Sequence, residues 1–244
     1  MVLDIALIVV SVLLTIVSLA SCVISVWLFR RYRRFNKQEN SIGKTGTQIA
    51  REILDNNGLQ HIQVKRTGSL FFGNSYSHYF KKVRLRSFIR HENSLTSVGM
   101  GAQKAALAIL DKENDPDMRK RIRLIPLITF GPFAFIPLVV IGALLDFYAF
   151  NESGVCTIVL GCLGILFYAY AIVLSVQTLK TERKAQQRAY EILRDDYHIT
   201  DSELTDLKDL FHLYNVQYVN DIILSSLELL YTVLKVAAEL NKNK

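Results

Sequence analysis

Three long segments without a charged side chain constrain the fold of this chain more than any other feature. They are Ile5–Phe29, Leu124–Leu145 and Gly154–Leu179. Each reaches the roughly 20 apolar residues that a helix needs to cross a bilayer. Because lipid offers no partners to backbone polar groups, each segment predicts a membrane-spanning helix. The second contains three prolines and is expected to be kinked while still spanning.

The positive charges predict how these helices are oriented. Lys and Arg residues lie at one end of each segment: Arg30, Arg31, Arg33, Arg34 and Lys37 after the first, Arg119, Lys120, Arg121 and Arg123 before the second, and Lys180, Arg183 and Lys184 after the third. The opposite ends carry acidic residues and no Lys or Arg. The positive-inside rule therefore places the N-terminus and the 146–153 loop outside and the main soluble regions in the cytoplasm. We expect a multi-pass protein of the cell membrane.

The net charge of +7 follows from these flanking residues. Cations next to a membrane segment lie near the anionic headgroups of the cytoplasmic leaflet. The lipid bilayer is thus the expected partner of the basic residues, and nothing in the charge pattern calls for a nucleic acid.

The order of segments predicts a mainly α-helical membrane protein with a small α+β cytoplasmic region. The expected divisions are a membrane helix at 1–29, a basic flank and linker at 30–45, the α+β region at 46–123, a membrane helix at 124–145, an external loop at 146–153, a membrane helix at 154–179, and a C-terminal cytoplasmic helical region at 180–244.

Within the α+β region, residue periodicity predicts two helices and a small sheet. Apolar residues at helical spacing favour helices at 46–56, capped by Thr47, and at 94–110. Alternating patterns favour strands at 61–65 and 82–86, with a further strand at 69–72 and a turn at 73–75.

The C-terminal region predicts three helical stretches. A helix continues from the third apolar segment through Asp195, and Thr200 to Glu203 forms a capping box that opens a helix to about Tyr214. The segment 216–240 is mostly apolar and carries charges at seven-residue spacing: Asp221, Glu228 and Lys235. Such a stripe favours a helix lying against the bundle or the membrane surface, and a fourth span is the alternative.

The stretch Gly101-Ala102-Gln103-Lys104-Ala105-Ala106-Leu107-Ala108 carries a resemblance to a known family. Its surroundings resemble the YugP-like neutral zinc metallopeptidases of bacterial membranes, from about Gly46 to Tyr231. Four further segments take part in the resemblance: Thr45–Leu59, His78–Leu85, Thr181–Ala189, and the chain from Asp206 onward, which is similar to the family's closing helices. The second is similar to the family's His-Tyr-Asp-Pro-Arg, of which Asp-Pro-Arg is not kept. The resemblance implies a zincin-like core and, in the family, a zinc ion.

At the motif itself the chain departs from the family, whose helix carries a sequence like Ala-Ala-His-Glu-Val-Gly-His-Ala. Gln103 and Leu107 stand at the two His positions, Lys104 stands at the Glu position, and Glu182 matches the family's downstream acidic residue. Two His four residues apart on a helix ligate one zinc, and the Glu activates its water. An amide is a poor zinc ligand, leucine offers no lone pair, and an ammonium has no acceptor and repels a cation. We therefore expect no catalytic residue and no bound cofactor, because the zinc site is lost.

The predicted function is a non-catalytic pseudopeptidase of the inner membrane that binds a membrane-protein substrate or partner, or a peptide. Two alternatives stay open: an active metallopeptidase with an atypical site that includes Glu182, and an unrelated structural or transport component of the membrane. In the last case Leu107 would be a core residue, Lys104 would reach solvent or headgroups, and Glu182 would be one polar residue at a helix exit. The oligomeric state is not determined by the sequence.

Overall fold

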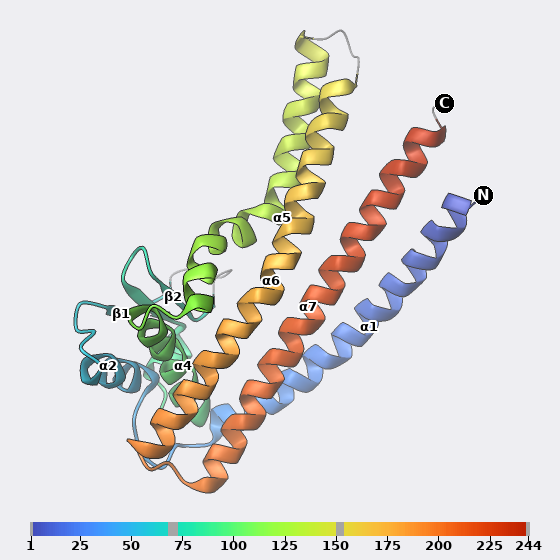
Figure 1. Cartoon of the computed structure of the whole chain (residues 1–244). Coiled ribbons are helices and arrows are strands. Elements are labelled where there is room, and N and C mark those ends of the chain that lie inside the picture. Colours follow the sequence, from blue (N-terminus) through green and yellow to red (C-terminus); the bar gives the residue numbers. More distant parts are fainter. Residues whose placement is uncertain (1, 68–72, 150–153, 243–244) are drawn as a thin grey trace. The chain divides into compact units, whose positions relative to one another are not determined.

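The computed structural model describes residues 2–67, 73–149 and 154–242, and most of them lie in helices (Figure 1). The elements are α1 (Val2–Lys37), α2 (Gly46–Asn56), β1 (Gln63–Arg66), β2 (Ser75–Ser77), β3 (Lys82–Leu85), α3 (Ser87–His91), α4 (Leu95–Lys112), α5 (Pro116–Ala149), α6 (Val155–Asp195) and α7 (Asp201–Lys242). The chain forms two compact units. Unit 1 comprises residues 1–24, 123–177 and 218–244, and unit 2 comprises residues 25–122 and 178–217.

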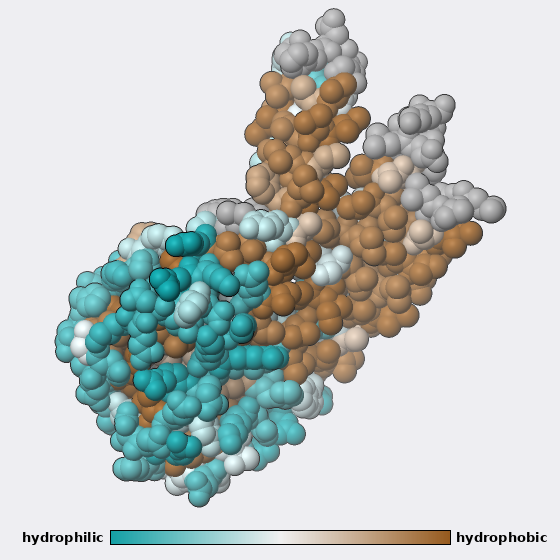
Figure 2. Space-filling model, viewed as in Figure 1, coloured by the Kyte–Doolittle hydropathy of each residue, from teal (hydrophilic) through white to brown (hydrophobic). Residues whose placement is uncertain are grey.

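Unit 1 consists of the apolar parts of four helices, whose surface is strongly hydrophobic (Figure 2). Among the described residues, two helices are long and apolar enough to cross a membrane, Ile5–Lys37 and Val155–Asp195. The remaining expected span contributes a shorter apolar stretch, Phe135–Tyr148, within α5. Figure 1 shows a bend in α5, as expected for a helix that contains Pro126, Pro132 and Pro137.

The helices α5 and α6 pack closely within unit 1. A Cβ atom at Gly142 would lie 2.6 Å from the Cα atom of Thr157, so only glycine allows this approach. Asp146 accepts hydrogen bonds from the backbone amides of Cys156 at 3.0 Å and Thr157 at 2.8 Å. Its carboxylate thus caps the first turn of α6, where free amides favour a negative charge.

The helix α7 is continuous over its 42 residues, so the break expected near Tyr214 is absent. From Tyr218 onward it belongs to unit 1, where its side chains bond to two other helices. Asn220 Nδ2 donates to Ser21 Oγ of α1 at 2.7 Å, and Glu228 Oε2 accepts from Tyr168 Oη of α6 at 3.4 Å. This part of α7 therefore lies alongside the two helices that are apolar and long enough to span.

Unit 2 contains a three-stranded sheet in the order β1-β3-β2. The strands β1 and β3 are parallel, and β2 is antiparallel to β3. The two strands expected from alternation at 61–65 and 82–86 are present within a residue or two of the predicted bounds. The strand expected at 69–72 lies outside the described residues. Ser75, expected in a turn, instead begins β2.

The helix α4 is the core of unit 2, because every residue from Leu95 to Leu110 is buried. Its small residues let neighbouring elements approach on several sides. A Cβ atom at Gly101 would lie 2.4 Å from the backbone oxygen of Gly46, so α2 and α4 cross backbone to backbone at these two glycines. The helix that carries the motif positions is consequently held rigidly.

The caps of these helices explain where they begin. Ser94 caps α4 through a hydrogen bond from the amide of Ser97. The cap of α2 is Thr45 rather than Thr47, and it forms a capping box with Gln48. The side chain of Thr47 instead donates to the carbonyl oxygen of Arg90 at 2.9 Å. The prediction of the helix was confirmed, but the prediction of its capping residue was wrong by two positions.

Candidate functional site

The three positions that the sequence predicts to correspond to the family's motif lie on α4, and none of them faces solvent. The exposed fractions are 4% for Gln103, 8% for Lys104 and 0% for Leu107. Because α4 is surrounded on all sides, the ammonium group of Lys104 is buried in the protein. A buried ammonium is costly unless it is paired with a carboxylate and hydrogen-bonded.

The partner of Lys104 is Glu182, which comes from α6. The Lys104 ammonium lies 3.0 Å from Glu182 Oε2, and Gln103 Nε2 donates to the same oxygen at 2.9 Å. The other carboxylate oxygen, Oε1, accepts from Nη2 of Arg121 at 2.8 Å. We call Gln103, Lys104, Arg121 and Glu182 the Glu182 cluster. It joins α4, α5 and α6, and all four residues belong to unit 2.

The electrostatics of the Glu182 cluster favour an ionised carboxylate. Burial alone would raise the pKa of Glu182, but the charges and hydrogen bonds of Lys104 and Arg121 outweigh it, and the pKa is lowered. Two cations and one anion leave the cluster with a net charge of +1. Both carboxylate oxygens are already engaged by cationic donors, so the group is neither a free base nor a free ligand.

Arg121 is the member of the cluster that sequence reasoning missed. It stands in a run of cations before an apolar segment, which suggested a position among the lipid headgroups. In the structure it is 9% exposed and turned into unit 2. A signal was present, because Met118 and Ile122 lie three residues before and one after Arg121 and both are buried. This spacing places all three on one face of a helix.

Lys184, another of the cations that flank an apolar segment, pairs with two carboxylates. Its ammonium lies 2.8 Å from Asp115 and 2.6 Å from Asp117, at the start of α5. Hydrogen bonding to Lys184 lowers the pKa of Asp117. Glu182 therefore does not pair with Lys184, its near neighbour in the sequence. Its partners Lys104 and Arg121 are distant in the chain.

Leu107 lies one helical turn beyond Gln103 and contributes to the core. It is among the largest fully buried side chains of the chain. An isobutyl group has no donor or acceptor, so this position adds packing to α4 and no chemistry.

The residues at this site do not fit a zinc ion. A zinc site in a zincin needs lone pairs from two imidazoles and a carboxylate. Here one position is aliphatic, the Gln103 amide donates from nitrogen, and the carboxylate is shared by two cations. In the part of the chain that the structure describes, no three His, Cys, Asp or Glu side chains are grouped to hold a metal.

A second polar cluster lies near the C-terminal end of α4. Asp111 Oδ2 accepts from Tyr76 Oη at 2.6 Å and lies 2.6 Å from Nδ1 of His78. Tyr76 is on β2, and His78 begins the turn that follows it. Asp111 thus ties the sheet and its β2–β3 turn to the motif helix.

Comparison with known proteins identifies the family of this chain. Residues 9–237 match the family model described as "Putative neutral zinc metallopeptidase". The chain is 26% identical over 204 residues to a Bacillus subtilis protein described as "Putative membrane protease YugP", covering 83% of this chain and 85% of the relative. No solved structure matches the chain. Since the family model covers nearly all of the sequence, this chain belongs to the neutral zinc metallopeptidase family.

Proposed function

We propose that this chain is a non-catalytic member of its family, a bacterial inner-membrane pseudopeptidase that binds a membrane-protein substrate or partner without cleaving it. The observation that carries the proposal is the state of Glu182. Its carboxylate is bound by Lys104 and Arg121 through both oxygens. Three protein donors, two of them cationic, already occupy this carboxylate, and the two positive charges oppose the approach of a metal ion.

The two cations replace a dication in charge and in position. In an active relative, zinc would join the motif helix to the downstream acidic residue. Here Lys104 makes that connection from α4, and Arg121 adds a second from α5. Such a substitution preserves the link between helices and removes the Lewis acid. We also propose that α2, the sheet and α4 correspond to the zincin-like core implied by the resemblance.

A protein that keeps the family's overall structure but lacks its zinc chemistry can still bind a substrate or partner. The described relative is named as a membrane protease, and two helices of this chain are apolar and long enough to span a bilayer. A membrane protein, or a peptide released from one, is therefore the class of partner we propose. Regulation of an active relative by competition for such a substrate follows from this role.

Metal analysis of the purified full-length protein tests the proposal. After exposure to zinc and dialysis in mild detergent, we expect far less than one zinc ion per chain by elemental mass spectrometry. Glu182→Gln should leave this background unchanged, as should the matched variant Glu113→Gln. Stoichiometric zinc that falls in Glu182→Gln but not in Glu113→Gln would overturn the pseudopeptidase assignment in favour of an active enzyme with an atypical site.

For the membrane arrangement, we propose that α1, α5 and α6 span with the N-terminus and the 146–153 loop outside and unit 2 in the cytoplasm. We further propose that α7 crosses the membrane as a fourth span from about Tyr218. Its contacts with Ser21 and Tyr168 support this, because both partners lie in apolar spanning segments. The hydrogen bond to Glu228 offsets part of the cost of a carboxyl group at membrane depth.

A reporter fused to Lys244 distinguishes the two arrangements of α7. Four spans put the C-terminus outside, so a C-terminal alkaline phosphatase fusion should be active and a C-terminal green fluorescent protein fusion dark. The opposite pair of signals would show that the C-terminus lies on the cytoplasmic side and that α7 does not cross the membrane, the arrangement that the sequence alone favours.

A further inference from the structure

A long stretch of unit 2 carries positive charge only. Between Asp55 and Glu92 the sequence contains no Asp or Glu, and it contains seven Lys and Arg residues: Lys65, Arg66, Lys81, Lys82, Arg84, Arg86 and Arg90. Within the described residues, none of the seven forms an ion pair with a carboxylate. The sheet of unit 2 is therefore built from a segment whose charges are left uncompensated.

Strand register gathers three of these cations on one face of the sheet. Lys65 on β1 pairs with Arg84 on β3, and Lys82 lies two residues before Arg84. Side chains two residues apart on a strand point to the same face of the sheet, and so do the side chains of paired residues on neighbouring strands. The opposite face carries Val83 and Tyr76, which are buried. The cations therefore occupy the outer face of the sheet, where Lys65 is exposed and Lys82 and Arg84 are partly exposed.

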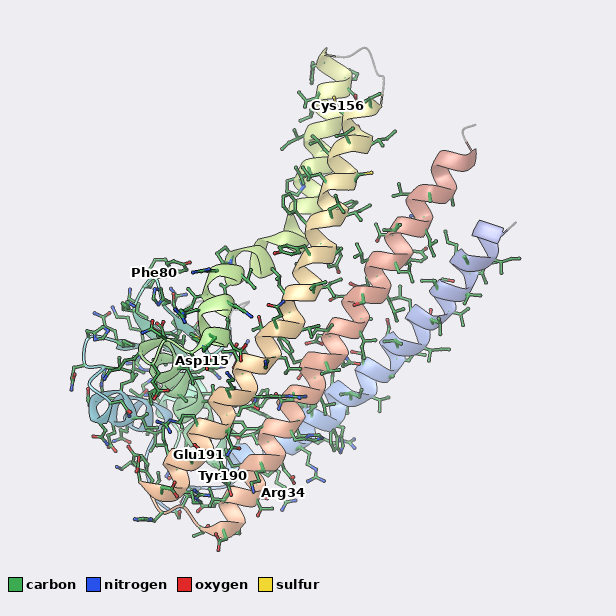
Figure 3. All side chains as sticks on the ribbon, viewed as in Figure 1. Arg34, Phe80, Asp115, Cys156, Tyr190 and Glu191 are labelled. Atoms are coloured by element: carbon green, nitrogen blue, oxygen red, sulfur yellow. The ribbon has the colours of Figure 1, made fainter. Side chains whose placement is uncertain are left out.

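Two large aromatic side chains extend this face at the β2–β3 turn. Tyr79 is 64% exposed and Phe80 is 63% exposed, and Figure 3 labels Phe80 on this turn. The Arg84 guanidinium lies 5.4 Å from the centre of the Phe80 ring. Adjacent exposed aromatics among unpaired cations are the composition of surfaces that contact the headgroup region of a bilayer.

The turn is held firmly, and its anchor lies next to a membrane segment. His78 is fixed by Asp111, and Tyr79 Oη donates to the carbonyl oxygen of Ile122 at 3.4 Å. Ile122 is two residues before Leu124, where the second apolar segment begins. Chain continuity thus keeps the aromatic turn close to the point where α5 would meet the bilayer.

We propose that the outer face of this sheet and the turn at 78–81 form a membrane contact, in which Phe80 and Tyr79 enter the headgroup region and Lys65, Lys82 and Arg84 bind anionic lipid headgroups. The occupant is the cytoplasmic leaflet of the membrane that holds the chain. Anionic lipid complements the uncompensated charge, and the aromatic rings lose their exposure to water. The inference rests on the proposed span at 124–145, and it adds a contact made by unit 2 itself.

Spin-label depth measurements on the full chain in nanodiscs test this contact. In a background with Cys22, Cys156 and Cys162 replaced by serine, labels are placed through Phe80→Cys, Gln60→Cys or Val140→Cys. Gln60 is an exposed control in unit 2, and Val140 is 51% exposed in the apolar part of α5. Accessibility to oxygen is then compared with accessibility to a water-soluble nickel complex, in discs with and without phosphatidylglycerol.

The contact predicts that the label at residue 80 favours oxygen in discs with phosphatidylglycerol, while the label at residue 60 favours nickel. Replacing Lys65, Lys82 and Arg84 together by glutamine should return residue 80 toward the value of residue 60. Equal accessibility at 80 and 60, with residue 140 in lipid, overturns the contact and leaves the proposed function standing. Equal insertion in neutral discs overturns the role of anionic lipid. A water-accessible residue 140 would refute the span and the inference with it.

Discussion

Replacing Glu182 by glutamine should lower the free energy of unfolding by about 3 kcal/mol, because it leaves two buried cations without a counter-charge. Lys104 and Arg121 are each less than a tenth exposed, and Glu182 is the one carboxylate that bonds to them among the described residues. The amide of glutamine keeps the size of the side chain and some of its hydrogen bonds. The decrease in the free energy of unfolding therefore measures the contribution of the negative charge. Circular dichroism during chemical unfolding in mild detergent measures it.

The matched control is Glu113→Gln. Glu113 lies 3.4 Å from Arg188, and both side chains are more than 40% exposed. An exposed pair of this kind contributes about 0.5 kcal/mol. Similar losses for the two variants would show that the Glu182 cluster is not the buried charge centre described above.

The effect of Glu182→Gln should also depend on pH. The pKa of Glu182 is lowered in the folded protein, so its ionisation stabilises the fold above the unfolded-state pKa of about 4.3. This contribution is lost as the pH falls through the lower folded-state pKa. The difference between wild type and variant should therefore be largest near neutral pH and shrink below about pH 4. A difference that stays constant down to acid would contradict the charge-based explanation.

Rebuilding the family's motif should restore zinc binding, and the bond between Arg121 and Glu182 predicts that a fourth substitution strengthens it. We expect stoichiometric zinc in a variant with Gln103→His, Lys104→Glu, Leu107→His and Arg121→Gln. The first three changes supply the two imidazoles and the base. The fourth removes the cation that holds Glu182 Oε1 at 2.8 Å and releases the carboxylate to act as a ligand.

The triple variant that keeps Arg121 should bind zinc more weakly than the quadruple variant. Two like unit charges 4 Å apart repel each other by about 1 kcal/mol in water and by about 4 kcal/mol at the effective dielectric of a protein surface. Repulsion of this size between Arg121 and a zinc ion would lower the affinity for zinc roughly 5- to 1000-fold. Equilibrium dialysis with elemental analysis compares the two variants directly. Equal affinities would show that Arg121 moves away freely and plays no part in blocking the site.

Two further results decide whether the motif positions correspond to the family's site. Adding Glu182→Ala to the quadruple variant should weaken zinc binding again, since it removes the acidic ligand. A quadruple variant that stays folded by circular dichroism and takes up no metal would refute the correspondence of Gln103, Leu107 and Glu182 with the family's ligands. Family membership would be unaffected, because it rests on the match across residues 9–237.

The sequence by itself determined most of the helices and two of the three described strands, because their signals are local, whereas the short helix α3 and the continuity of α7 were not predicted. Apolar spacing placed α2 at Gly46–Asn56 as observed and α4 within two residues of its observed ends. Helix periodicity, capping side chains and uncharged segments depend on residues a few positions apart, which a linear reading captures. The three-residue strand β2 was missed because so short a segment shows no alternation, and its pairing with β3 defines it.

Only the tertiary structure decided which charges pair and which side chains are buried. Lys104 and Glu182 are 78 residues apart, and Arg121 was indistinguishable by residue type from the cations beside it. Packing places Lys104 of α4 and Arg121 of α5 inside unit 2, where burial makes a shared carboxylate necessary. The same holds for α7, whose place beside α1 and α6 depends on hydrogen bonds between distant segments, which local periodicity does not encode.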